Sequence, residues 1–225
     1  MDPAGPRVGT YSRADPAEST ALYLRLMQPI VPILFAAVVG MGHAFEPDHL
    51  LAVSTLVTRH DRLGPALRDG LFWGLGHTTM LVLFGSIIIF SRATWLHSGY
   101  FEAAVGVMLI GLGISRLVDK NSYQSFQLPK QRVGFAYTVG LVHGLAGSGA
   151  LVLAVLSAIA QPAWAVAYIL LFGLGSVLGM LVAVSLMRVP FTLRMQLGRR
   201  LRAGAVVLSS ALSVGYGGWM VWTHV

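Results

Sequence analysis

Residues 30–58 form a long apolar stretch with four ionisable side chains near its middle. They lie in the segment GMGHAFEPDHLLAV and are His43, Glu46, Asp48 and His49. An ionisable side chain at the centre of a bilayer costs about 2.5–3.5 kcal/mol on insertion scales, so it usually marks a functional site. The alternative is a helix that ends at the membrane interface, but apolar sequence resumes directly after the motif. We therefore interpret this segment as a functional site within the membrane.

Pro47 lies among these side chains and predicts a break in the helix. Proline has no backbone N–H, and its ring crowds the carbonyl group of the residue four places earlier, which is His43. On an unbroken helix, Asp48 and His49 would point about 140° and about 240° away from His43. A break would let the three side chains converge on one ion. Imidazole and carboxylate ligands together suit Ni²⁺, Co²⁺ or Zn²⁺, and Asp48 could bind the ion or orient an imidazole.

The composition places this motif in a polytopic membrane protein. Of 225 residues, 55% are hydrophobic and 11% are charged, whereas soluble domains carry about 25% charged residues. The chain has no cysteine, which excludes thiol redox chemistry, disulfides and cysteine-bound zinc. The net charge of +7 comes from basic residues in short loops. Such residues contact anionic lipid headgroups, so we expect a lipid bilayer and no nucleic acid as partner.

Long apolar stretches predict an all-α membrane protein with six transmembrane helices, because one span needs about 20 residues. The first and fourth stretches are longer than that, so we expect these two helices to be broken partway. Residues 1–29 are predicted to form a polar N-terminal segment with a short interfacial helix, and residues 119–132 a cytoplasmic linker. The six predicted spans cover residues 30–58, 68–91, 98–118, 133–160, 163–187 and 202–223.

Basic residues are distributed unevenly between alternate loops. Twelve of the 16 lysine and arginine residues lie in the loops after the first, third and fifth predicted spans. An excess of lysine and arginine marks the cytoplasmic side of a membrane. We therefore expect an integral protein of a bacterial or archaeal plasma membrane, with both termini outside the cytoplasm.

The two halves of the chain, 30–118 and 133–225, resemble each other. GMGHAF at 40–45 parallels GLVHGL at 140–145, and the block FWGLGHTT parallels LFGLGSVL. Helices rich in Gly, Ala and Leu match one another easily, but here two separate blocks align in the same order. Because each half contains three predicted spans, the halves would have opposite orientations, which makes them inverted three-helix repeats.

In transporters built from inverted repeats, interrupted helices at corresponding positions indicate the central site. The interruption in the first half is Pro47, and the corresponding stretch of the second half contains Gly147, Ser148 and Gly149. We expect these residues to interrupt the two helices and to line the ion pathway.

Four further side chains could serve the site. His77 lies near the middle of the second span and is a candidate fourth ligand, although a lone histidine there could instead bond a neighbouring carbonyl group. His143 holds the place in the second half that His43 holds in the first, and could bind the ion, relay a proton or have a structural role. Glu46 could be a ligand, a proton acceptor or a charge at the entrance to the site. Thr78 could line the path of the ion.

These motifs resemble those of the nickel/cobalt permease superfamily. HAFEPDH at 43–49 matches its H-x4-D-H signature, and LGHTTM at 75–80 resembles its second motif. GLVHGLAGSGAL at 140–151 is similar to the six-span urease-accessory nickel-permease branch, while the later acidic signatures of the superfamily are missing. The resemblance implies a metal site with four ligands. They are His43, Asp48, His49 and His77.

The resemblance also implies a secondary transporter for Ni²⁺ or Co²⁺, with Zn²⁺ as a third option. The metal is the substrate, and we expect neither a prosthetic group nor enzymatic activity. Efflux members of the superfamily often carry a histidine-rich cytoplasmic loop, which residues 119–132 lack, so uptake is favoured. The alternatives are a membrane metal-binding accessory or sensor protein and a membrane metalloenzyme that uses the same residues.

Overall fold

The computed structural model describes residues 30–57, 63–91, 99–118, 132–145, 161–192 and 199–225, together with residues 15, 20 and 159. All regular secondary structure in these residues is helical, as the sequence predicted. The helices are α2 (Ile30–His43), α3 (Pro47–Val57), α4 (Leu63–Ser91), α5 (Gly99–Val118), α6 (Arg132–His143), α8 (Pro162–Thr192) and α9 (Arg199–His224).

Four of these helices are long and apolar enough to cross a membrane, and each overlaps one predicted span. The apolar segments are Leu63–Ile87 in α4, Gly99–Val118 in α5, Pro162–Met187 in α8 and Ala203–His224 in α9. The first predicted span is divided between the shorter helices α2 and α3, and the fourth is described only as far as residue 145. The total of six spans therefore stays a prediction.

Residues 44–46 separate α2 from α3, where the sequence predicted a break. α2 ends at His43, and the N–H of Glu46 donates to the His43 carbonyl oxygen at 3.0 Å in a tight turn. α3 begins at Pro47, where the missing N–H costs nothing because the first turn of a helix has no intrahelical acceptor for it. Asp48 follows in that first turn, where a negative charge is favourable. The proline therefore ends one helix and begins the next.

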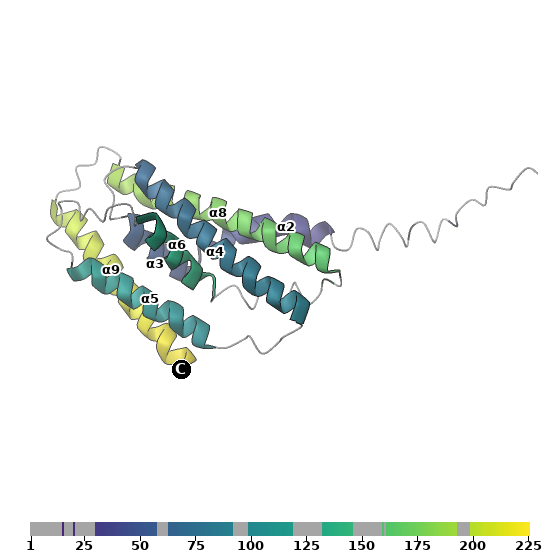
Figure 1. Cartoon of the computed structure of the whole chain (residues 1–225). Helices are drawn as coiled ribbons and strands as arrows, with labels where there is room; N and C mark the ends of the chain where they lie inside the picture. The colour runs from purple at the N-terminus through teal and green to yellow at the C-terminus, as the bar shows by residue number, and fades with distance from the viewer. Residues whose placement is uncertain are drawn as a thin grey trace, which may run out of the picture.

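The helices form two groups (Figure 1). α4 and α8 run side by side, with α2 packed against α8 and α6 packed against α4. α5 and α9 form a second closely packed pair. α3 contacts helices of both groups, and one buried apolar cluster that includes Trp73, Leu109 and Met180 joins them. The short helix after the break therefore lies in the interior of the bundle.

Two glycines let α2 and α6 approach their partner helices closely. A Cβ atom at Gly40 would collide with the carbonyl oxygen of Phe172 in α8, and one at Gly140 would collide with the carbonyl oxygen of Trp73 in α4. Small residues at helix crossings permit such backbone contact in membrane bundles. The four residues hold matching places in the similar blocks of the two halves, so the two halves make matching contacts.

Several predictions concern residues outside the described part of the chain. They are the interfacial helix within 1–29, most of the linker 119–132 and the second part of the fourth span, which contains Gly147, Ser148 and Gly149. These stay predictions.

Candidate metal centre

Five side chains of metal-ligating type gather where α2 ends and α3 begins, beside α4 and α6. His43 ends α2, Asp48 and His49 lie in the first turn of α3, His77 lies in α4 and His143 ends α6. His49, His77 and His143 are fully buried, and the other two are 5% exposed. Because burial removes water from these polar groups, each needs a partner inside the protein or a bound ligand.

His43, His49 and His77 form the first of two overlapping groups, which we name the trihistidine group. The ring centre of His49 lies 4.4 Å from that of His43 and 5.1 Å from that of His77. One nitrogen of each ring lies within 4.8 Å of the other two. Nitrogens bound to one tetrahedral ion at about 2.1 Å lie about 3.4 Å apart. Small ring rotations would therefore close this group around an ion.

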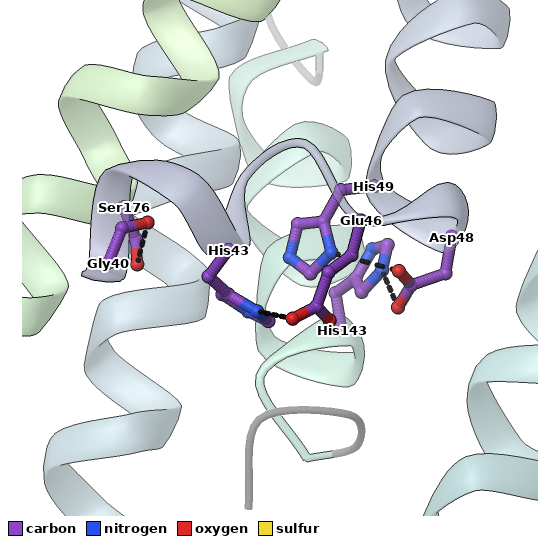
Figure 2. A network of polar contacts seen from close by, with 7 residues as sticks. All are labelled: Gly40, His43, Glu46, Asp48, His49, His143 and Ser176. Carbon is purple, nitrogen blue, oxygen red and sulfur yellow. Dashed lines mark hydrogen bonds and ion pairs between the residues drawn. The ribbon is translucent and has the colours of Figure 1, made fainter. Parts of the chain in front are cut away.

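Asp48, His49 and His143 form the second group, which we name the Asp48 group. The carboxylate bridges the two rings, with Oδ1 3.1 Å from His49 Nδ1 and Oδ2 3.0 Å from His143 Nε2 (Figure 2). The ring centres of His49 and His143 are 4.1 Å apart. A carboxylate that accepts an imidazole N–H fixes the tautomer and orientation of that ring. For His49, this leaves Nε2 as the nitrogen with a free lone pair.

Several ring nitrogens of the cluster have no hydrogen-bond partner among the residues that the structure describes. A buried polar atom left without a partner costs about 1–3 kcal/mol, so a group of such atoms in one place indicates a ligand site. Imidazole nitrogens are ligands that nickel, copper, iron and zinc share. The nitrogens are His43 Nδ1, His43 Nε2, His49 Nε2, His77 Nδ1, His77 Nε2 and His143 Nδ1.

Glu46 reaches the cluster from its edge. Its side chain is 40% exposed, and its Oε1 lies 2.8 Å from Nδ1 of His43 (Figure 2). The distance is short, but the two groups are not aligned for a hydrogen bond, and the contact is an ion pair. Glu46 thus connects the surface of the protein with the buried imidazoles.

Trp73 is a member of the site that the sequence analysis did not single out. Its ring centre lies 5.6 Å from that of His49 and 5.6 Å from that of His143, and its side chain is fully buried. Trp73 stands one helical turn before His77 in α4. Residues four apart share a helix face, and this spacing could have predicted its place.

Phe172 and Ser176 of α8 were also missed. The ring of Phe172 lies 5.5 Å from that of His43, and the Ser176 hydroxyl donates to the Gly40 carbonyl oxygen at 3.1 Å (Figure 2). The two residues occupy the places in LFGLGSVL that correspond to the tryptophan and the histidine of FWGLGHTT. The internal similarity was therefore the signal that could have found them.

The structure brings the four predicted ligands together and adds His143 to them. Thr78, which we expected to line the path, donates its hydroxyl to the Gly173 carbonyl oxygen at 3.1 Å and so joins α4 to α8. Pro47 lies at the break itself, as predicted.

A helical bundle with four apolar spans and a buried cluster of ligating side chains defines an integral membrane protein with a candidate metal centre. No family model and no solved structure matches the chain. The chain is 38% identical over 175 residues to the urease accessory protein UreH of Bacillus sp. (strain TB-90), and the alignment covers 69% of this chain and 75% of that protein. The chain therefore belongs to the family of urease accessory protein UreH.

Proposed function

We propose that the chain is a secondary transporter that takes up a divalent transition metal ion, with Ni²⁺ as the first candidate and Co²⁺ as the second. The observation that carries this proposal is the buried cluster of four imidazoles and one carboxylate inside a bundle of membrane-type helices. Ionisable side chains in such a place mark ion pathways. A borderline cation that has shed its water is the substrate that these donors suit.

The choice of nickel rests on two supports. One is the resemblance to the urease-accessory nickel permeases, and the other is membership in the family of a urease accessory protein. The donor set agrees, because Mg²⁺ and Ca²⁺ prefer oxygen ligands, whereas imidazole suits nickel, and divalent affinities rise from Co²⁺ to Ni²⁺. Zn²⁺ binds similar donors and is the natural competitor in binding tests.

The mechanism we propose is alternating access around a site shared by two inverted three-helix repeats. The matching close contacts at Gly40 and Gly140 support the repeats, because related segments make equivalent contacts. The distribution of lysine and arginine supports extracytoplasmic termini. The absence of histidine from residues 119–132 supports uptake over efflux.

Two other functions would use the same residues. A membrane metalloenzyme would need an open coordination position at the metal and a path for its substrate. An accessory or sensor protein would bind the ion without releasing it on the other side of the membrane. Both alternatives expect metal binding without metal flux, so a flux measurement separates them from transport.

The test is uptake of radioactive Ni²⁺ by proteoliposomes that contain the purified full-length chain. We expect uptake well above that of protein-free vesicles, and a loss of about 100-fold in His49→Asn, because that imidazole belongs to both groups of the cluster. His224→Asn is the matched control, since it removes an imidazole that is 34% exposed and lies at the end of α9. Wild-type uptake no faster than in protein-free vesicles would refute transport.

A further inference from the structure

The trihistidine group and the Asp48 group overlap in one side chain, His49. The ring centre of His49 lies 4.4 Å from that of His43 in one group and 4.1 Å from that of His143 in the other, and Figure 2 shows the His49 ring between His43 and Asp48. Both groups are fully or almost fully buried. The cluster therefore offers ligands in two overlapping places.

We propose that the cluster holds a single divalent ion in two successive positions, and that the ion passes between them by exchanging one nitrogen of His49 for the other. The first position is the trihistidine group, and the second is the Asp48 group. This inference rests on the proposed transport of a transition metal ion. It assigns Asp48 and His143 to a transfer step and removes them from the resting site.

The chemistry of His49 makes the two positions exclusive. A neutral imidazole has one nitrogen with a free lone pair and one N–H. A carboxylate only accepts hydrogen bonds, so Nδ1, which lies 3.1 Å from Asp48 Oδ1, carries the proton. The lone pair is then on Nε2, which has no hydrogen-bond partner among the described residues. An ion held by the Asp48 group would need Nδ1 instead, so the proton on Nδ1 must pass to Nε2 as Nε2 releases the ion. One ring therefore serves one ion at a time.

The hydrogen bonds decide which position the ion occupies at rest. In the trihistidine group, the nitrogens His43 Nε2, His49 Nε2 and both nitrogens of His77 lack hydrogen-bond partners in the described part of the chain, so an ion there displaces none. In the Asp48 group, both carboxylate oxygens are engaged by imidazole nitrogens at 3.0 and 3.1 Å. An ion that enters the Asp48 group must replace these two contacts, so the Asp48 group is the less favourable position for the ion.

The position of Glu46 indicates which of the two positions the ion reaches first. This half-exposed carboxylate lies 2.8 Å from His43, which belongs to the first position only. His143 belongs to the second position only and ends α6, and it is fully buried. An ion that arrives along Glu46 therefore meets the trihistidine group first and the Asp48 group afterwards.

The test compares His77→Asn with His143→Asn in purified full-length protein, by calorimetric titration with Ni²⁺ and by Ni²⁺ flux in proteoliposomes. We expect His77→Asn to lower the Ni²⁺ affinity about 100-fold, because it removes a ligand of the resting position. We expect His143→Asn to bind one Ni²⁺ per chain with an affinity close to that of the wild type, and to lose flux about 10–100-fold. His224→Asn should leave both measurements unchanged.

Equal losses of affinity in the two variants would overturn the inference, because all five side chains would then form one site. Wild-type flux in His143→Asn would also overturn it. Absence of flux in the wild type would count against transport, while the binding comparison would still decide between one and two positions. If His143→Asn does not fold, as judged by gel filtration, His143→Gln replaces it with the same expected result, since it removes the same imidazole and leaves the contact between Asp48 and His49 in place.

Discussion

At the scale of single residues, Asp48 is the side chain that links the cluster through its contacts with two imidazoles. A buried carboxylate loses its hydration and is tolerated only where donors replace the lost water. Here two imidazole nitrogens from different helices, His49 and His143, take that role. The carboxylate therefore joins α3 to α6 and sets which nitrogen of His49 faces the other imidazoles.

Trp73 gives a prediction about the packing around this cluster. Its side chain is fully buried and packs against two imidazole rings, so Trp73→Ala should lower the free energy of unfolding by about 3–5 kcal/mol. Thermal melting followed by circular dichroism in detergent measures the change. Trp222→Ala is the matched control, because Trp222 is 87% exposed, and its effect should stay within about 0.5 kcal/mol. Equal shifts in melting temperature would contradict the packing described here.

Some residues of the cluster could be predicted from the sequence, but one of their contacts could not. His43, Asp48 and His49 could be found because they interrupt an apolar stretch, where each ionisable group is costly. The sequence could not predict that Asp48 pairs with His143, because that contact depends on how α6 packs against α4. From the sequence, His143 could bind the ion, relay a proton or have a structural role, and no sequence feature distinguished these roles.

At the scale of helices, the break before Pro47 was predictable because the effect of proline on a helix is local. The packing partners of α2 and α6 were not predictable in the same way. They depend on close backbone contacts at Gly40 and Gly140 with helices from the other half of the chain. A glycine in sequence does not reveal which carbonyl group it will meet.

The contact at Gly140 can be tested within one helix. A methyl group there would meet the carbonyl oxygen of Trp73, so Gly140→Ala should cost about 1–3 kcal/mol through overpacking. Gly134→Ala lies in the same helix with nothing within 4 Å of the added carbon, and should be neutral or stabilising by up to about 1 kcal/mol. Melting curves of the two variants in detergent give the comparison. A Gly140→Ala protein as stable as Gly134→Ala would disprove the close approach of α6 to α4.

At the scale of the whole molecule, the two halves of the chain interlock. α2 packs on α8, α4 on α6 and α5 on α9, and each pair joins one helix from each half (Figure 1). A movement of one half against the other as rigid bodies would separate the backbone contacts at Gly40 and Gly140. The cluster is built in the same way, with four side chains from the first half and His143 from the second.

The central claim is that this interlocked interior binds a transition metal ion through buried imidazoles. An anomalous-difference map from crystals of the Ni²⁺-loaded protein measures it most directly. We expect a peak inside the bundle, about 2.1 Å from a ring nitrogen of His49, with His43 and His77 as neighbours. Nickel peaks found only at surface groups such as His224, with none in contact with His49, would contradict the claim.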